Sequence, residues 1–260
     1  MKNKLKILPT SLLIEYQLSI KLSELKFKFD NLIDADISTD SFNFYSSVAS
    51  VYSSKIEGEN IELDSYIKHK KYAVEFKPNY TKKIDDLYNA YSFAQNNVLN
   101  KSNIEIAHKL LTKNILSEQL QGEIRRQNMY VFTSEGKIEY VAATMYEVHE
   151  EIEKFYDDLH ILISEKLTIE EVFFFASMIH LIFVKIHPFN DGNGRTARLL
   201  EKWFLAQKLG EKAWFVQSEK FYYNQHQIYY NNLRTIGLEY IELDFSKALP
   251  FLLMLTNSIV

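Results

Sequence analysis

The stretch TIEEVFFFASMIHLIFVKIHPFNDGNGRTARLLEKWFLAQKLG, residues 168–210, decides the fold of this 260-residue chain. It opens with Thr168 and Glu171, which have the spacing of a helix capping box. The apolar run from Val172 to Ile186 predicts a helix buried in a core. Because this run is fifteen residues long and contains a histidine and a lysine, it is too short and too polar for a membrane span.

A second helix follows after a short loop. Proline disfavours helical geometry in the residue before it, so Pro188 places His187 at the start of the loop. The next helix is expected from near Gly194 to Leu209, with Gly210 as its stop. The two helices therefore present the residues of the loop at one end of the pair.

Composition predicts a mostly helical protein with short connections. The chain has seven glycines and four prolines, and these are the residues that break regular structure. Residues 10–60, 61–100 and 103–120 carry apolar residues at helical spacing, with a break between helices expected at 77–79. Residues 241–260 are expected to pack as a last helix, and a homodimer contact there is left open.

One segment predicts strands. Two short β-prone runs, Met129–Phe132 and Ile138–Val141, flank a polar turn that contains Gly136. An isolated hairpin is marginal in water, so this one must rest on the helices. The expected fold class is therefore all-α with one small β-hairpin at about 128–141.

Charge and cysteine content argue against several classes of function. A formal net charge of −4 supplies no basic field for nucleic acid. The absence of cysteine excludes disulfides and thiol chemistry, and it fits a reducing cytoplasm. Pro9 and the polar residues after it interrupt the apolar N-terminal run, so no signal peptide is predicted. We expect a cytoplasmic protein that binds neither nucleic acid nor membranes.

The loop at 187–198 contains groups that suit an anion. The glycines Gly192 and Gly194 precede a helix, where free backbone N–H groups and the helix dipole favour negative charge. Arg195 and Arg198 lie three residues apart on the next turn, so both guanidinium groups point to the same side. Guanidinium forks match the oxygens of a phosphate.

A metal ligand and a base accompany this anion site. Asp191 is a hard oxygen ligand, as Mg²⁺ between phosphates requires, and His187 can accept a proton near neutral pH. Taken singly, a histidine before a proline is usually structural, Phe189 is an apolar anchor of the loop, and His180 is a satisfied core histidine. The joint occurrence of these groups within twelve residues favours chemistry on a nucleotide or another phosphate ester.

Residues 187–198, HPFNDGNGRTAR, resemble the Fic/Doc signature His-Pro-Phe-x-(Asp/Glu)-Gly-Asn-Gly-Arg-x-x-Arg at every fixed position. The resemblance implies an α-helical Fic fold and transfer of AMP from ATP to a Ser, Thr or Tyr hydroxyl of a target protein, with the enzyme itself as a further candidate target. The Doc branch, which resembles a kinase, has a bulkier residue in place of the second glycine. Gly194 therefore favours transfer of AMP over transfer of phosphate.

The resemblance also implies a role for each residue of the loop. His187 would deprotonate the target hydroxyl, and Asp191 would hold Mg²⁺ on the α- and β-phosphates of ATP. The residues implied to bind the phosphates are Gly192, Asn193, Gly194, Arg195 and Arg198, the last of them at the γ-phosphate.

Two further segments are similar to parts of the family. The hairpin at 128–141 stands where the family has a flap, along which a target protein docks by strand addition. The aromatic residues at 221–223 and 229–230 resemble the helix that lines the adenine pocket, and Tyr230 is the candidate contact. A cluster so rich in tyrosine is also typical of packing.

A second motif lies ahead of the signature. Ser53-Ser54-Lys55-Ile56-Glu57-Gly58 matches the inhibitory motif (Ser/Thr)-x-x-x-Glu-(Gly/Asn), on a helix expected at about 42–58. Ser53 and Glu57 share a helix face, and Gly58 is expected to stop the helix. The resemblance implies that Glu57 pairs with Arg198 and occupies the site of the γ-phosphate, which leaves ATP misaligned for attack. By pattern alone the segment is an ordinary helix end.

Rival functions stay open. Some family members use the inhibitory glutamate to activate water and remove AMP from a modified protein, and Glu57 is compatible with that. A toxin-like module restrained by a partner is another alternative, against which the motif within this chain argues. A transcriptional regulator is disfavoured because no helix-turn-helix with a basic face is evident.

The resemblance divides the chain into three parts. Residues 1–100 form an N-terminal helical region with the inhibitory helix. Residues 101–240 form the Fic core with the flap and the signature loop, and residues 241–260 form a helical tail.

Overall fold

The computed structural model describes residues 5–40, 42–76, 80–132, 136 and 138–259. The predicted break at 77–79 and most of the predicted turn, at 133–135 and 137, lie outside this part of the chain. The helices are α1 (Leu13–Ser19), α2 (Leu22–Asp30), α3 (Phe44–Ile56), α4 (Leu63–Tyr72), α5 (Lys82–Gln95), α6 (Lys101–Leu111), α7 (Val148–Ser164), α8 (Ile169–Ile186), α9 (Asn193–Leu209), α10 (Ser218–Asn224), α11 (His226–Thr235) and α12 (Leu249–Asn257). The strands β1 (Tyr130–Phe132) and β2 (Ile138–Val141) pair antiparallel. The prediction of an all-α fold with one β-hairpin is confirmed.

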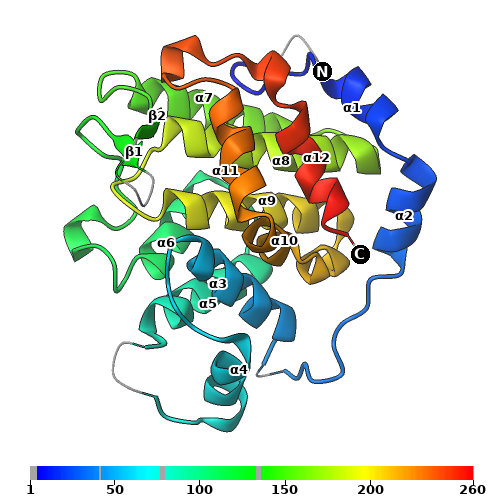
Figure 1. Ribbon diagram of the computed structural model, residues 1–260, viewed down its shortest axis with the longest axis vertical. Coiled ribbons are helices and arrows are strands. Elements are labelled where there is room, and N and C mark those ends of the chain that lie inside the picture. The colour runs from blue at the N-terminus through cyan, green and yellow to red at the C-terminus, as the bar shows by residue number, and fades with distance from the viewer. Residues whose placement is uncertain (1–4, 41, 77–79, 133–135, 137, 260) are drawn as a thin grey trace.

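Helix α8 forms the centre of the core (Figure 1). Every residue from Val172 to Ile186 is buried. The predicted capping box is present, because the Thr168 hydroxyl accepts from the Glu171 N–H and the Glu171 carboxylate accepts from the Thr168 N–H. Within the described ranges, no helix is both long and apolar enough to cross a membrane.

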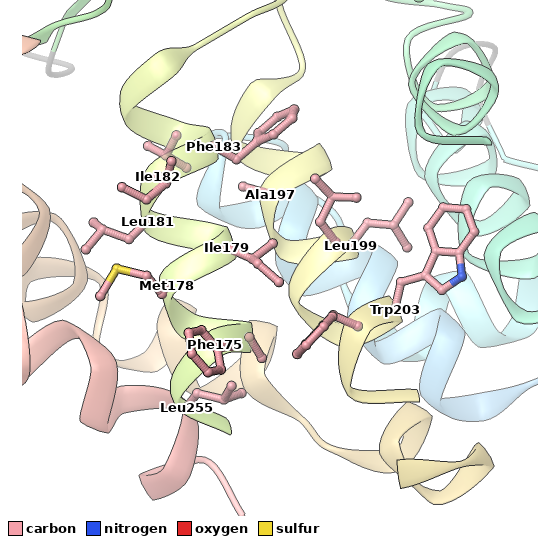
Figure 2. Packing of buried hydrophobic residues seen from close by; sticks show 14 of the residues in the cluster. Phe175, Met178, Ile179, Leu181, Ile182, Phe183, Ala197, Leu199, Trp203 and Leu255 are labelled. Atoms are coloured by element: carbon pink, nitrogen blue, oxygen red, sulfur yellow. The ribbon is translucent and has the colours of Figure 1, made fainter. Parts of the chain in front are cut away.

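Helix α9 packs along α8 and carries the other half of the core. Figure 2 shows Ile179 and Phe183 of α8 on the side that faces Ala197 and Leu199 of α9. On another side of α8, the buried face of α12 covers the helix and contributes Leu255. The apolar face of the C-terminal tail is therefore inside the molecule, and a homodimer contact there stays a prediction.

The N-terminal helices α3, α4 and α5 lie at one end of the molecule (Figure 1), where α3 and α5 also contribute to the main core. A second cluster of buried side chains holds α4 against α3 and α5, and its members are Val51, Ile61, Tyr66, Ile84 and Tyr88. Helix α3 packs on α5 and α10 and also reaches α9. The end of α3 lies beside the start of α9, because Arg198 donates to both the Ser53 carbonyl and the Glu57 carboxylate.

Two helix predictions were too long. Residues 31–43, expected to be helical, separate α2 from α3, and there the Asp34 carboxylate accepts from the backbone N–H of Ala35 and so competes with helical pairing. The helix expected at 103–120 ends at Leu111. Soon after that point Asp86 of α5 accepts from both the backbone and the side-chain amide of Asn114, at 2.8 Å each, which draws the chain away from the helix axis.

Candidate functional site

The loop at 187–198 begins with an unusual backbone conformation. His187 caps the end of α8 with φ of 53° and ψ of 59°, in the left-handed region that a non-glycine residue rarely adopts. Arg125, buried in the connection between α6 and β1, donates from Nε to the His187 carbonyl at 2.7 Å and from Nη2 to the Ile186 carbonyl at 3.2 Å. The sequence argument missed Arg125, whose place beside the loop depends on a contact 62 residues along the chain.

The Asn193 side chain closes the loop on itself. Its Oδ1 accepts from the Phe189 N–H and its Nδ2 donates to the Phe189 carbonyl, both at 2.9 Å. The Asn193 carboxamide, predicted to contact phosphate, is thus engaged by the backbone and shapes the loop. The Phe189 ring is fully buried, as expected of an anchor.

His108 of α6 also contacts this loop, and the sequence argument missed it as well. Its ring stacks on Phe189 with 3.7 Å between centroids. The Gly122 N–H donates to His108 Nδ1 at 2.8 Å, so the ring proton is on Nε2, which donates to the Asp191 carbonyl at 2.9 Å. Burial lowers the pKa of His108 to about 4, so this neutral form is the one present near neutral pH.

The carboxylate of Glu57 lies at the N-terminus of α9. Glu57 follows the last residue of α3, and its Oε1 accepts from Arg198 Nη2 at 2.6 Å. A Cβ placed on Gly194 would come within 2.5 Å of the same oxygen. Only a glycine therefore lets the carboxylate approach the helix end this closely, and the first turn of α9 holds an anionic group supplied by the chain itself.

Arg198 is enclosed by groups from the end of α3 and from α11. It is 1% exposed, and besides Glu57 it donates from Nε to the Ser53 hydroxyl at 2.8 Å and from Nη2 to the Ser53 carbonyl at 3.0 Å. Its Nη1 reaches the Tyr229 hydroxyl at 3.5 Å. Burial opposes the charge on Glu57, but Arg198 and then Arg195 outweigh it and hold the pKa of Glu57 below its usual value. The pair is therefore ionised at neutral pH.

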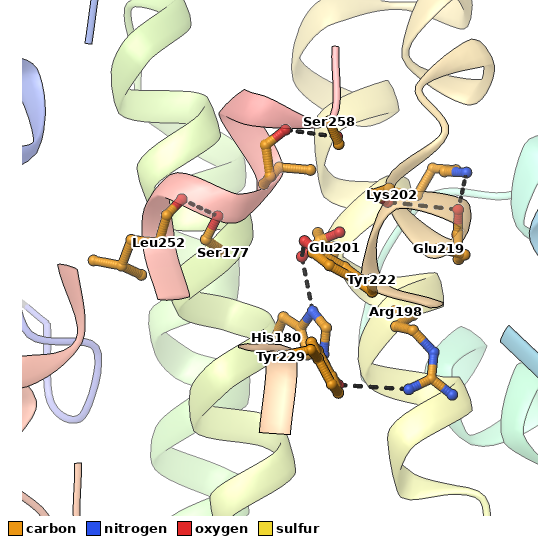
Figure 3. Close-up of polar contacts among 12 residues, drawn as sticks. Ser177, His180, Arg198, Glu201, Lys202, Glu219, Tyr222, Tyr229, Leu252 and Ser258 are labelled. Carbon is orange, nitrogen blue, oxygen red and sulfur yellow. Dashed lines mark hydrogen bonds and ion pairs between the residues drawn. The ribbon is translucent and has the colours of Figure 1, made fainter. Parts of the chain in front are cut away.

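A buried polar chain continues from Arg198 into the core (Figure 3). The Tyr229 hydroxyl bonds His180 Nε2 at 2.9 Å, and His180 Nδ1 bonds Glu201 at 2.8 Å. His180 is thus the satisfied core histidine that the sequence predicts. Tyr229 joins Arg198 to that chain, a role that its place in a tyrosine-rich helix did not reveal.

Arg195 differs from Arg198 in having unsatisfied donors. The residue is 7% exposed, yet Nε and Nη1 are buried and have no hydrogen-bond partner among the described residues. Buried guanidinium donors are normally paired. An anion bound at this end of α9 would supply the missing acceptors.

Asp191 and Tyr230 lie at the edge of the site. Asp191 is exposed, and its Oδ1 accepts from the Gly192 N–H at 2.6 Å. The Tyr230 ring is partly buried and contacts the Tyr229 ring edge to face, with 5.1 Å between centroids. Burial and the Glu57 carboxylate raise the pKa of Tyr230 above its usual value, so its hydroxyl stays protonated.

A pocket of about 430 Å³ lies on the Asn190 side of the loop. The residues that line it are Gln119, Leu120, Glu123, Ile124, Arg126, Gln127 and Asn190. Most of them belong to the connection between α6 and β1, which also supplies Arg125. The loop therefore has one face toward Glu57 and another toward this mixed polar and apolar hollow.

Residues 98–205 match the model of the Fic/DOC family. A Fic family protein from Desulfovibrio desulfuricans G20 superposes with a TM-score of 0.73 at 19% identity, over 96% of this chain and 72% of the other. A Fic domain containing signaling protein from Bacteroides thetaiotaomicron VPI-5482 gives 0.64 at 16% identity, over 92% and 93%.

Residues 134–508 of Fic-1 from C. elegans give a TM-score of 0.67 at 16% identity, over 96% of this chain and 70% of the other. No curated protein matches the sequence. At these identities the structural likeness concerns the fold, and the activity has to be argued from the site.

Proposed function

For this chain, which carries a Fic/DOC family domain at residues 98–205, we propose the activity of a protein adenylyltransferase restrained by its own Glu57. The observation that carries the proposal is the anion site at the start of α9, where the Glu57 carboxylate lies against Gly194 and Arg198. A site that holds a carboxylate by a guanidinium donor beside a helix N-terminus also suits a phosphate.

In the proposed reaction the target hydroxyl oxygen attacks the α-phosphorus of ATP and its proton passes to His187. The bond to the β-phosphate oxygen breaks, and pyrophosphate leaves with the bonding electrons. Burial lowers the pKa of His187 to about 4, so the imidazole is neutral and can accept a proton near pH 7. Arg195, with its unsatisfied donors, would bind the phosphate tail.

The residues at the site fit Mg²⁺ bound together with ATP. No group of three or more histidine, cysteine or acidic side chains suited to a metal occurs in the described part of the chain. Asp191 is exposed at the start of the anion site, and Mg²⁺ commonly takes one or two carboxylates, substrate phosphates and water. The ion would neutralise phosphate charge, while Asp191 would fix its place.

The restraint follows from competition for Arg198. The γ-phosphate and Glu57 would need the same guanidinium group, so ATP would bind with its phosphates displaced while Glu57 remains. A displacement of about 1 Å at the reacting centre can lower the rate on the order of 10²-fold. The resting enzyme is therefore expected to be weakly active.

The flap would complete the site. Strand β1 and strand β2 form the hairpin beside His187, and Tyr130 and Phe132 are exposed on β1. An extended target segment could add along this hairpin by main-chain pairing. Tyr230, on α11, is proposed as the adenine contact.

The test uses ATP labelled at the α- or the γ-phosphate and incubated with the Glu57→Gly variant and a cell lysate. Incorporation of α-label without γ-label into the protein or a target is expected, and it should exceed that of the wild type. His187→Ala in the Glu57→Gly background should abolish it. Incorporation of γ-label would instead indicate a kinase, and no gain in Glu57→Gly would refute the restraint.

Removal of AMP is the second candidate. The Glu57 side chain is 28% exposed and its pKa is held below the usual value, so an ionised carboxylate is open to water beside the loop. It would then act as a base toward water. Assays of AMP transfer and AMP removal on one substrate, with Mg²⁺ and Ca²⁺ compared, distinguish the two activities. Glu57→Gly would abolish removal while raising transfer.

A further inference from the structure

The flap strand β2 places a phenol against the imidazole of His187. Tyr140 is 2% exposed, and its hydroxyl oxygen lies 3.0 Å from His187 Nδ1 and 3.1 Å from the carbonyl oxygen of Val184. His187 Nδ1 is also 3.3 Å from that carbonyl. Three polar atoms therefore form one small triangle, which holds the Nδ1 side of the ring.

Only one placement of the protons gives each of these three atoms a hydrogen-bond partner. The Val184 carbonyl only accepts, and the Tyr140 hydroxyl has a single proton to donate. If that proton goes to Val184, the Tyr140 oxygen can accept an N–H from His187 Nδ1. In the opposite arrangement the unprotonated Nδ1 would face the lone pairs of the Val184 carbonyl across 3.3 Å. The geometry thus favours a proton on Nδ1 and a lone pair on Nε2.

The protein has to impose this tautomer of His187. Near neutral pH the His187 ring is neutral because burial lowers its pKa to about 4, so it carries one ring proton. In water, neutral histidine prefers that proton on Nε2, which would leave the wrong nitrogen as the acceptor. His108, whose Nδ1 accepts from Gly122, shows the Nε2-protonated form within the same molecule.

The Tyr140 ring is itself held in place. Lys185 of α8 is buried, and its Nζ lies 4.3 Å from the centre of the Tyr140 ring while donating to the Gly237 carbonyl at 3.2 Å. The ring meets the His187 ring edge to face, with 5.9 Å between centroids. Burial lowers the pKa of Lys185 to about 7, so near neutral pH its protonated fraction adds a cation on the ring face, an attraction that is independent of the hydroxyl.

We propose that Tyr140 is a positioning residue that keeps the proton of neutral His187 on Nδ1, so that Nε2 is the atom that receives the proton of the attacking hydroxyl. This rests on the proposed function of His187 as a base. After transfer both ring nitrogens carry protons, and the Tyr140 oxygen continues to accept from Nδ1. Tyr140 touches no reacting atom, and it acts through the orientation and tautomer of the imidazole.

The direct test is ¹⁵N NMR of the protein labelled at histidine, with the His187 signals assigned by their loss in His187→Gln. In the wild type we expect a protonated shift at Nδ1 and an unprotonated shift at Nε2 of His187, and the reverse at His108. The wild-type spectrum alone overturns the proposal if His187 Nδ1 is unprotonated.

The second arm compares Tyr140→Phe with the wild type. Loss of this hydrogen bond should shift the tautomer ratio of His187 about five-fold toward the Nε2-protonated form, as expected for a typical net hydrogen bond. In the Glu57→Gly background kcat for AMP transfer should fall by up to about the same factor, with KM for ATP unchanged. An unaltered His187 spectrum in Tyr140→Phe refutes the role of the hydroxyl.

The matched control is Tyr16→Phe. Tyr16 is also buried and its hydroxyl bonds Thr256, far from the loop, so its variant should leave the His187 signals and kcat unchanged. The two hypotheses fail separately. If the tautomer shifts in Tyr140→Phe and no AMP transfer is found in any variant, the positioning of His187 stands and the proposed function does not.

Discussion

Replacing Glu57 by glutamine should change stability and ATP affinity in opposite directions. The substitution keeps the volume of the side chain and removes the charge that Arg198, 1% exposed, contacts at 2.6 Å. Hydrogen bonds to charged groups contribute about 1.5–3 kcal/mol. Arg198 keeps Ser53 and Tyr229 as partners, and the Glu57 side chain is 28% exposed, so we expect a loss of about 1–2 kcal/mol in the free energy of unfolding.

The same contact opposes the γ-phosphate. If Glu57 and ATP compete for Arg198, removal of the charge should tighten ATP binding by about 1–2 kcal/mol, which corresponds to roughly 5–30-fold in Kd. Urea unfolding measures the first effect and calorimetric titration with Mg·ATP the second. At saturating ATP the variant should regain the stability that it loses without ligand.

Glu59→Gln is the matched control. Glu59 lies two residues beyond Glu57 and pairs with Lys83 at 2.6 Å. The Lys83 side chain is 41% exposed, far more than that of Arg198. Its loss should change stability by less than about 1 kcal/mol and leave Kd unchanged. A Glu57→Gln variant that is destabilised but binds ATP no more tightly than the wild type would contradict the competition.

Three other predictions follow from the site and the core. Burial lowers the pKa values of His187 and His108 to about 4, whereas in the unfolded chain both protonate near about 6.5. The free energy of unfolding should therefore fall as pH decreases from about 6.5 to 4, by about 3 kcal/mol for each histidine. Urea titrations across that window check this, and His108→Gln should flatten the slope. Asp191→Asn should weaken ATP binding with Mg²⁺ far more than without it, with little change in Tm, since Asp191 is exposed; equal weakening in both conditions would contradict a metal role. Ile179→Ala in the α8 core should lower the free energy of unfolding by about 2–5 kcal/mol, whereas Ile14→Ala, at a side chain 60% exposed, should change it by less than about 0.5 kcal/mol.

The spacing of residues in the sequence predicted where α8 begins and where α8 and α9 end. Thr168 and Glu171 predicted the start of α8, Pro188 predicted its end, and Gly210 predicted the end of α9, because capping and turn geometry act within a few residues. The same reasoning fails where a side chain from elsewhere competes with the helix, as Asp86 does just beyond α6.

Only the tertiary structure decided which distant groups meet at the loop. Arg125, His108 and Tyr140 support it from other elements, and no local pattern in their own segments distinguishes them from residues that merely pack. Glu57 and Arg198 are 141 residues apart, so the two motifs could predict the pairing only through a resemblance. The packing of α3 against α9 brings these charges together. A buried guanidinium donor without a partner is costly, and Glu57 supplies a partner for Arg198.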